Sequence, residues 1–198
     1  MRAIAGKEDA SLIILAGGES RRMGRAKPLI DTPSGTLLEH IVRRLGMIFS
    51  ETLVVGRSQM PIPVGTRFVR DRYPVRSPLV GIEAGLSAAA HDRCFVMGCD
   101  MPFAEPALVR HLVAAAHGVE AVIPVVRGYD EPLFAVYRRE VLPLIQRAIA
   151  AGELKVGAVC AQLHAARIEE EELRRFDPEL RSFTNLNTPR DLLALRRL

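Results

Sequence analysis

The chain has 198 residues, of which 48% are hydrophobic and 25% are charged, and its net charge is +4. This length and hydrophobic content are enough to bury one sizeable core, so a single domain spanning residues 1–198 is expected. The positive charge suits anionic small molecules. Nucleic acid is disfavoured as a partner, because the basic residues are scattered and only 5% of residues are aromatic.

Targeting signals are not evident in the sequence. No apolar run approaches the roughly 18 residues that a membrane-spanning helix needs, and the charged residues 7–9 interrupt any amino-terminal signal peptide. Cys94, Cys99 and Cys160 are odd in number and form no C-x-x-C pair, which suits reduced thiols in the core or in strands. We therefore expect a cytoplasmic protein with no membrane partner.

The first motif follows an apolar run at residues 12–15, which predicts a buried strand. The run continues into Gly17 and Gly18, which allow the backbone to turn tightly. Successive N–H groups in such a turn form an anion-binding concavity. Four mobile donors follow at Arg21, Arg22, Arg25 and Lys27. Together these features predict a polyphosphate site, and hence a nucleotide ligand.

The alternative is a surface loop that is basic by chance. Only three of the 27 lysine and arginine residues are lysines, so a compact ammonium at Lys27 favours a site that reaches along a triphosphate. Gly24 is followed by Arg25 and Ala26, which excludes the P-loop spacing. The G-x-G-x-x-G fingerprint is also absent from this turn, which argues against bound NAD or FAD.

The next segment carries a helix start. Thr36 and Glu39 form a capping box, and Leu37, Ile41 and Leu45 recur at helical spacing. A helix is therefore expected directly after Thr36.

Strand-like and helix-like segments alternate along the rest of the chain. Strands are expected at residues 52–55, 67–69, 94–97, 121–126 and 133–137, and further helices at 79–90, 105–116, 139–151 and 188–198. This alternation predicts an α/β fold, with a largely parallel sheet covered by helices on both faces. The six residues between the last two strands are too few for a crossover helix, so one strand is expected to run in reverse.

Asp100 follows the strand expected at residues 94–97, in the sequence Cys-Asp-Met-Pro. Ligands of open α/β sheets bind beyond the carboxyl ends of strands, which places Asp100 at the same edge as the Gly17 turn. A carboxylate there can hold Mg²⁺ whose other ligands are phosphate oxygens and water. The alternative is an aspartate that starts a turn before Pro102.

Asp71 also follows a strand, and it is flanked by Arg70, Arg72 and Arg76. One interpretation is a surface ion pair of small energetic value. The other is that Asp71 faces the nucleotide and accepts hydrogen bonds from guanine N–H groups. Spacing alone does not separate the two interpretations.

Gly81 and Gly85 are expected on one face of the helix at residues 79–90. Their missing side chains would permit close approach of another element or of a ligand. Packing against another element is the favoured interpretation.

Asn185 and Asn187 stand two residues apart, just before a helix that Thr188 caps and Pro189 begins. On an extended segment both amides can point to one side and bind a ligand rich in heteroatoms. As turn formers they would need no partner.

Four motifs resemble the molybdenum cofactor guanylyltransferase family, in this order and nearly from end to end. They are L-A-G-G-E-S-R-R-M-G-R-A-K, C-D-M-P-F, E-P-L-F-A-V-Y and F-T-N-L-N-T-P-R-D-L. The resemblance implies a three-layer, Rossmann-like sandwich with a mostly parallel mixed sheet, of the nucleotide-diphospho-sugar transferase type. It also implies an enzyme of molybdenum cofactor biosynthesis that joins GMP from GTP to the phosphate of molybdopterin and releases pyrophosphate.

The resemblance implies roles for matching residues. Asn185 and Asn187 would lie toward molybdopterin, and Asp100 would hold Mg²⁺. The GTP-binding positions would be Leu15, Ala16, Gly17, Gly18, Lys27, Asp71 and Asp100. We assign catalysis to Arg22, Lys27 and Asp100, which would stabilise charge during in-line attack of the molybdopterin phosphate on the α-phosphorus of GTP. A molybdoenzyme apoprotein or its chaperone would be the partner that receives the product.

Three departures from the family pattern leave alternatives open. Arg25 stands where a glycine is frequent, Gly56-Arg57 replaces an asparagine, and Ser77 replaces a glycine. A related transferase that uses CTP or another small phosphate ester remains an alternative. So does a non-catalytic adaptor that binds nucleotide or molybdopterin.

Overall fold

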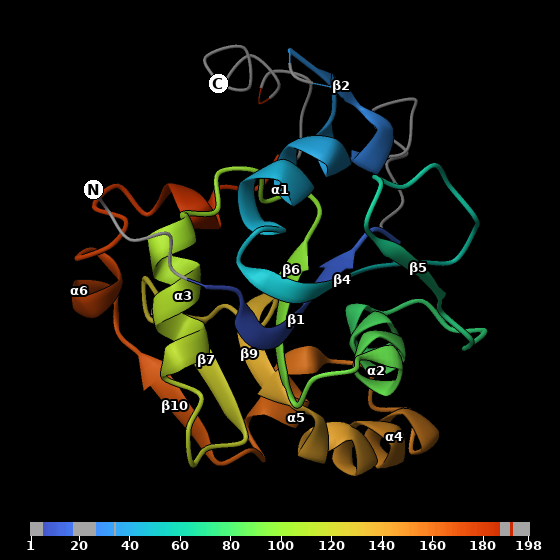
Figure 1. Ribbon diagram of the computed structural model, residues 1–198. Helices are drawn as coiled ribbons and strands as arrows, with labels where there is room; N and C mark the ends of the chain where they lie inside the picture. Colours follow the sequence, from blue (N-terminus) through green and yellow to red (C-terminus); the bar gives the residue numbers. More distant parts are fainter. Residues whose placement is uncertain (1–5, 18–26, 34, 187–190, 192–198) are drawn as a thin grey trace.

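The computed structural model describes residues 6–17, 27–33, 35–186 and 191 (Figure 1). Gly18, Arg22, Asn187 and the helix expected at residues 188–198 therefore lie outside the described residues.

An eight-stranded sheet forms the centre of the molecule (Figure 1). Its strands are β1 Glu8–Leu15, β4 Phe49–Gly56, β5 Arg67–Arg70, β6 Arg93–Gly98, β7 Ala121–Val126, β8 Tyr129–Asp130, β9 Phe134–Arg138 and β10 Ala165–Ile168. Their order is β10-β7-β9-β6-β1-β4-β5, with β8 paired to β7. Strand β1 pairs in parallel with β4 and β6, and β9 is antiparallel to both β6 and β7. The expected mostly parallel sheet with a reversed strand is therefore confirmed.

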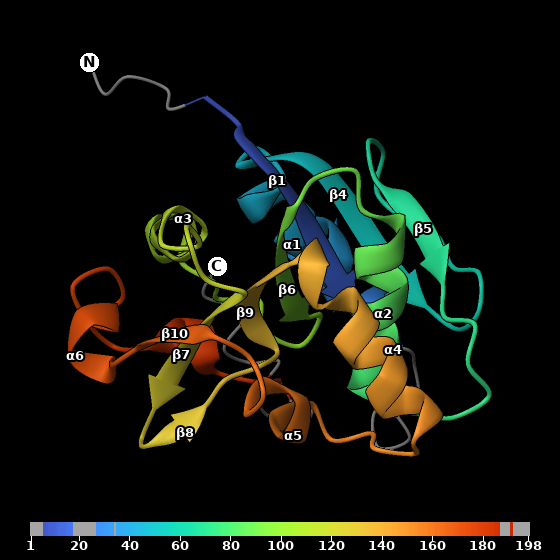
Figure 2. The same cartoon turned by 90° about the horizontal axis from the view of Figure 1, so that it is seen from below.

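Helices cover both faces of this sheet. They are α1 Leu37–Leu45, α2 Pro78–Ala88, α3 Pro106–Ala114, α4 Leu142–Ala150, α5 Val156–Cys160 and α6 Glu170–Leu173. Successive side chains of a strand point to opposite faces. Accordingly, Leu12 and Ile14 join the core under α1 and α3, while Ile13 joins the core under α2 and α4. Figure 2 shows α2 and α4 side by side on the same face of the sheet. These layers confirm the predicted three-layer α/β sandwich.

Helix α1 begins where the sequence predicted. The Thr36 hydroxyl accepts a hydrogen bond from the Glu39 N–H (3.2 Å), and the Glu39 carboxylate accepts one from the Thr36 N–H (2.6 Å). This reciprocal pair satisfies two N–H groups at the helix start. A small hairpin precedes it, formed by β2 Asp31–Thr32 and β3 Gly35–Thr36.

The helix expected at residues 139–151 is divided. A 3₁₀ turn occupies Arg139–Val141, and α4 starts at Leu142. Pro143 explains the division, because proline lacks an N–H and fits only the first turn of an α-helix.

Gly85 confirms the packing interpretation of the glycine pair in α2. A Cβ there would lie 2.6 Å from Cγ2 of Ile13 on β1, so only glycine allows the helix to pack this closely on the sheet. At Gly81 a Cβ would lie 3.2 Å from the Leu15 side chain, a less severe contact.

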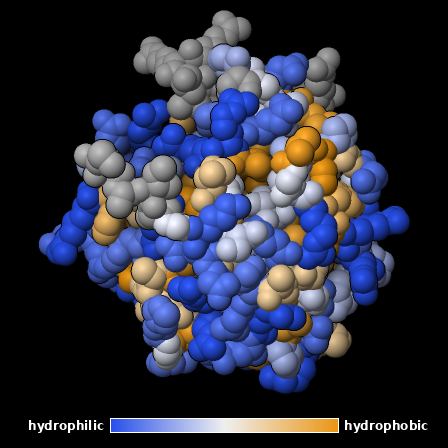
Figure 3. All heavy atoms as spheres, viewed as in Figure 1, coloured by the Kyte–Doolittle hydropathy of each residue, from blue (hydrophilic) through white to orange (hydrophobic). Residues whose placement is uncertain are grey.

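All three cysteines are free and buried, as expected. Across the part of the chain that the structure describes, no helix has the length and apolar character needed to cross a bilayer. The face of the molecule shown in Figure 3 is mostly hydrophilic, with its largest apolar area toward the upper right and smaller apolar spots elsewhere.

Candidate active site

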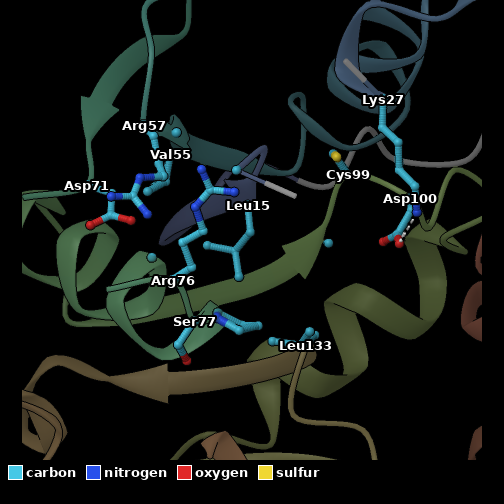
Figure 4. Close-up of a pocket in the computed structure, with 15 residues that line it drawn as sticks. Leu15, Lys27, Val55, Arg57, Asp71, Arg76, Ser77, Cys99, Asp100 and Leu133 are labelled. Carbon is cyan, nitrogen blue, oxygen red and sulfur yellow. Dashed lines mark hydrogen bonds and ion pairs between the residues drawn. The ribbon is translucent and has the colours of Figure 1, made fainter. Parts of the chain in front are cut away.

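A cavity of about 440 Å³ lies at the carboxyl ends of β1, β4 and β6 (Figure 4). Open α/β sheets bind their ligands at this edge. The lining residues are Leu15, Gly17, Lys27, Val55, Gly56, Arg57, Asp71, Arg76, Ser77, Pro78, Gly81, Gly98, Cys99, Asp100 and Leu133. Five of the positions predicted from the sequence, Leu15, Gly17, Lys27, Asp71 and Asp100, thus line one cavity.

The end of β1 forms the floor of this cavity. The Ala16 N–H donates to the Val55 carbonyl oxygen (2.7 Å), which holds the chain against β4 one residue past the strand. Ala16 is buried and does not line the cavity, whereas Gly17 is exposed and lines it. A Cβ at Gly17 would meet none of the other described residues within 4 Å, so that part of the chain leaves space above Gly17.

Lys27 and Asp100 meet at one end of the cavity, although 73 residues separate them in the sequence. The Lys27 ammonium donates to Oδ2 of Asp100 at 3.0 Å, and the two side chains are 17% and 28% exposed. Figure 4 shows this pair on the opposite side of the cavity from Asp71, Arg57 and Arg76. A cation and a carboxylate therefore stand together where an anionic ligand could reach both.

Gly98, the last residue of β6, allows the Asp100 carboxylate to occupy its position. A Cβ at Gly98 would lie 2.5 Å from Oδ1 of Asp100. The turn is further fixed by main-chain bonds from Cys99 N–H to the Leu15 carbonyl and from Gly98 N–H to the Leu133 carbonyl, both 3.1 Å. The Asp100 turn is thus held against β1 and against the segment that precedes β9.

Cys99 also lines the cavity, but its chemistry excludes a nucleophilic role. Burial raises the pKa of the Cys99 thiol to about 12. The thiol is therefore protonated at neutral pH, and the thiolate is the reactive form.

Asp71 lies on a loop that Arg57 holds in place. The Arg57 guanidinium donates to the carbonyl oxygens of Tyr73 (3.2 Å), Pro74 (3.2 Å) and Val75 (3.4 Å). The Asp71 carboxylate accepts from the Tyr73 N–H at 3.0 Å, and its own N–H donates to the Gly56 carbonyl at 3.0 Å. These bonds fix the loop that presents Asp71 to the cavity.

The amino end of α2 closes another side of the cavity. Ser77 caps this helix by accepting a hydrogen bond from the Leu79 N–H at 3.0 Å, and its hydroxyl donates to the Leu154 carbonyl at 2.6 Å. An anion is favoured at such a helix start, because unpaired N–H groups and the helix dipole point toward it. Ser77 can therefore replace a glycine here without loss of the helix start.

The donor set suits a metal that arrives with its ligand. Within residues 6–17, 27–33, 35–186 and 191, no three His, Cys, Asp or Glu side chains cluster as a metal site. Mg²⁺ commonly uses one or two carboxylates and takes its remaining ligands from phosphate oxygens and water. Asp100 alone can supply that carboxylate, provided a nucleotide supplies the phosphates.

Asn185 does not line this cavity. It is exposed, but the next residue, Leu186, is buried and donates its N–H to the Asp100 carbonyl at 2.8 Å. The segment that carries Asn185 is therefore attached to the Asp100 turn.

Several residues that form or support the cavity wall were not predicted from the sequence. Arg57 was noted only as a departure from the family pattern, although it holds the Asp71 loop. Gly98 precedes the Cys-Asp-Met-Pro motif, and its position directly after an apolar strand was a signal for a close approach. Leu133 belongs to the E-P-L-F-A-V-Y motif, to which no role had been assigned.

Comparison with known proteins identifies the family of the chain. Residues 12–167 match the model of the MobA-like NTP transferase domain. A protein of Pelotomaculum thermopropionicum, named "Probable molybdenum cofactor guanylyltransferase", is 34% identical over 94% of this chain and 92% of its own length. The "Molybdenum cofactor guanylyltransferase" of Desulfosudis oleivorans is 33% identical, with 91% of each chain covered.

A crystal structure from Archaeoglobus fulgidus is also similar. This molybdopterin-guanine dinucleotide biosynthesis protein A superposes with a TM-score of 0.80 at 30% identity, over 94% of this chain and 97% of that chain. The chain belongs to the MobA-like NTP transferase family, as the sequence motifs predicted. It is therefore a nucleotidyltransferase of the nucleotide-diphospho-sugar transferase fold.

Proposed function

We propose that this chain transfers GMP from GTP to the terminal phosphate of molybdopterin, which yields molybdopterin guanine dinucleotide and pyrophosphate. The observation that carries the proposal is the cavity at the carboxyl ends of the strands, which is lined by Gly17, Lys27, Asp71 and Asp100. The relatives named above as guanylyltransferases cover nearly the whole chain, which supports guanylyl transfer as the reaction.

GTP would lie across the first cavity, with its base and its phosphates at opposite sides. The Asp71 carboxylate would accept from the ring and amino N–H groups of guanine. The phosphates would meet the main-chain N–H groups of the turn after β1 and the Lys27 ammonium. The binding positions are then Leu15, Ala16, Gly17, Gly18, Lys27, Asp71 and Asp100.

Transfer would proceed by in-line attack of a molybdopterin phosphate oxygen on the α-phosphorus of GTP. A new O–P bond forms as the bond from the α-phosphorus to the bridging oxygen breaks, and pyrophosphate leaves with the bonding electrons. No general base is needed, because a phosphate monoester is already ionised at neutral pH. Arg22 and Lys27 would stabilise the charge that develops on the phosphate oxygens.

Mg²⁺ fits this site through Asp100, and when bound it would neutralise phosphate charge and assist departure of pyrophosphate. In the free protein the Asp100 carboxylate is paired with Lys27. Lys27 would therefore move from Asp100 toward the triphosphate when the nucleotide binds.

The acceptor would approach from the side of Asn185 and Asn187. The bond from Leu186 N–H to the Asp100 carbonyl attaches this segment to the catalytic turn, which supports that direction. A molybdoenzyme apoprotein or its chaperone would then take the product. The free, buried cysteines agree with a cytoplasmic location for these steps.

Pyrophosphate release provides the test. The protein is incubated with molybdopterin and Mg²⁺ together with GTP, CTP or ATP in separate reactions. We expect release with GTP well above that with CTP or ATP, and none after the metal is chelated. Equal or greater release with CTP would overturn the guanine assignment. Nucleotide binding without release would indicate the adaptor instead.

A further inference from the structure

A second cavity of about 400 Å³ is formed by the segment around β8 and by residues 174–184. Its walls include Val126, Tyr129, Glu131, Leu180, Phe183 and Thr184. The volume falls in the range of roughly 300–1,000 Å³ that is usual for small-molecule sites. Its walls combine charged and polar side chains (Arg127, Glu131, Arg174, Glu179 and Thr184) with the apolar side chains of Val126, Leu180 and Phe183 and the ring of Tyr129.

This second cavity lies at the same edge of the sheet as the first. Strand β7 ends at Val126, and β9 starts at Phe134 and runs in the opposite direction, so both of these ends meet the edge where the first cavity lies. Glu131 lines the second cavity and Leu133 lines the first, so one short segment borders both. Likewise, Thr184 lines the second cavity two residues before Leu186, which bonds to Asp100.

One wall of the second cavity is fixed by a buried carboxylate. Asp177, which is 7% exposed, accepts hydrogen bonds from the N–H groups of Arg181 (3.1 Å) and Ser182 (2.7 Å). The Ser182 hydroxyl accepts from the Glu105 N–H at 2.9 Å, which ties the wall to the start of α3. Leu180 adopts a left-handed backbone (φ 53°), a costly conformation that these contacts hold in place. The wall is therefore formed before any ligand arrives.

Phe183 completes this wall. Its ring packs at an angle against Phe134, with 4.9 Å between the ring centroids. An aromatic side chain held in this way offers a fixed apolar surface to a flat ring.

Glu131 places a carboxylate in this cavity. Its main chain is held at both ends, because its N–H donates to the Pro124 carbonyl (2.8 Å) and its carbonyl accepts from the Phe134 N–H (3.0 Å). The side chain is half-buried, and burial raises the pKa of its carboxyl group. Among residues 6–17, 27–33, 35–186 and 191, no group forms a hydrogen bond or an ion pair with the Glu131 carboxylate.

The charged groups around Glu131 come from three segments. Arg127, Arg174 and Glu179 line the same cavity. The Arg174 guanidinium is already bound to the Glu170 carboxylate (2.6 and 3.0 Å) and to the Pro178 carbonyl (2.5 Å). Glu131 is thus an acceptor that is available to a ligand bearing N–H donors.

We propose that the second cavity holds the pterin ring of the acceptor, and that the Glu131 carboxylate accepts hydrogen bonds from the ring and amino N–H groups of that pterin. This inference rests on the proposed function. Guanine and pterin carry the same 2-amino-4-oxopyrimidine face, so each presents paired N–H donors to a carboxylate. Asp71 in the first cavity and Glu131 in the second then recognise the two rings of the product in the same way. The acceptor phosphate reaches Asp100 across the segment that both cavities share.

Fluorescence titration with 6-hydroxymethylpterin tests this site without any turnover. We expect Glu131→Gln to weaken pterin binding by about tenfold to a hundredfold, as loss of a charged hydrogen-bond partner does. Tyr129→Ala, at a residue that is 75% exposed, should weaken binding by about threefold to tenfold with the fold intact. Binding of GTP should stay within about twofold of wild type in both variants, which also shows that they are folded.

Glu140→Gln serves as the matched control, because Glu140 lies outside both cavities and pairs with Arg138 on the surface. Unchanged pterin affinity in both Glu131→Gln and Tyr129→Ala would overturn the assignment. In steady state, the KM for molybdopterin should rise in Glu131→Gln while the KM for GTP stays constant. If wild type releases no pyrophosphate from GTP, the proposed function is wrong. The pterin titration still tests, independently of turnover, whether the second cavity binds a pterin.

Discussion

The two cavities share one edge of the sheet but are built in different ways. The first is formed by strand ends and by the turns that directly follow them, such as Gly17 after β1 and Asp100 after β6. The second combines the β7–β8 hairpin with residues 174–184, which come after the last strand. A site of the first kind is fixed by the sheet itself, whereas a site of the second kind depends on side chains such as Asp177 that hold its loops.

The largest effect is expected for Asp100→Asn, which should lower kcat without changing binding of the pterin acceptor. Asp100→Asn keeps the size of the side chain but removes its charge, so we expect kcat to fall by about 10²–10³-fold. Stability should change little, because a partly exposed ion pair contributes at most about 1 kcal/mol. Pyrophosphate release, thermal melting and the pterin titration are measured together, and pterin binding should be unchanged.

Asp92→Asn is the matched control for Asp100→Asn. Asp92 precedes β6 at the opposite end of the same strand and pairs with Arg138 on the surface. Its substitution should leave kcat within about twofold of wild type, as is usual for surface changes. Near-normal turnover in Asp100→Asn itself would remove Asp100 from the catalytic machinery.

Asp177→Ala tests whether the second cavity depends on this one side chain. The N–H groups of Arg181 and Ser182 would lose their acceptor, which should lower the free energy of unfolding by about 1–3 kcal/mol. The KM for molybdopterin should rise, while the KM for GTP should stay constant. The measurements are urea unfolding and steady-state kinetics with each substrate varied. A change confined to the KM for GTP would contradict the proposed division between the cavities.

Gly98→Ala should act on the first cavity alone. The new Cβ would displace the Asp100 carboxylate, and we expect kcat to fall by about tenfold because catalytic geometry tolerates little displacement. When Gly98→Ala is added to Asp100→Asn, kcat should fall little further, because both substitutions act on the side chain at position 100. Gly157→Ala is the control, since a Cβ there would meet no atom of the described part of the chain within 4 Å. Additive losses in the double variant would show that Gly98 acts independently of Asp100.

The smallest effect is expected for the pH dependence of stability in Glu131→Gln. Burial raises the pKa of this carboxyl group in the folded protein, so its contribution to stability is present below the unfolded pKa and is lost as pH rises through the folded pKa. Glutamine avoids that loss. The Tm values of Glu131→Gln and wild type should be similar at pH 4, and the variant should be higher by about 1–3 °C at pH 8. A lower Tm for the variant at pH 8 would indicate a structural role instead.

The sequence predicted the elements whose signals are local. The capping box at Thr36 marked the start of α1, and bare apolar runs marked β1, β6 and β7. It missed β10 and the short helices α5 and α6, because Ala165–Ile168 and the four or five residues of each helix are too short for a hydrophobic period to appear. Their structure comes from packing against the completed sheet.

The same limit applies to the candidate site. The rule that ligands lie at the carboxyl ends of strands was enough to bring Lys27 and Asp100 to one edge. The hydrogen bonds from Arg57 to the carbonyl oxygens of residues 73–75 could not be predicted from the sequence, because every residue has a main-chain carbonyl oxygen. Glu131 stood in a noted motif without a role, since the other wall of its cavity begins about forty residues later at Arg174.

The reversed direction of β9 has a consequence for how enzymes of this shape can diversify. Its neighbour β6 delivers a carboxyl end to the ligand edge, but β9 delivers its amino end, preceded by the Glu131-Pro132-Leu133 connection. The Tyr137 hydroxyl anchors this connection by donating to the Pro132 carbonyl at 2.8 Å. A protein engineer could therefore exchange Glu131 and the adjoining hairpin to select a new acceptor, and keep Leu133, which lines the nucleotide cavity and accepts from the Gly98 N–H.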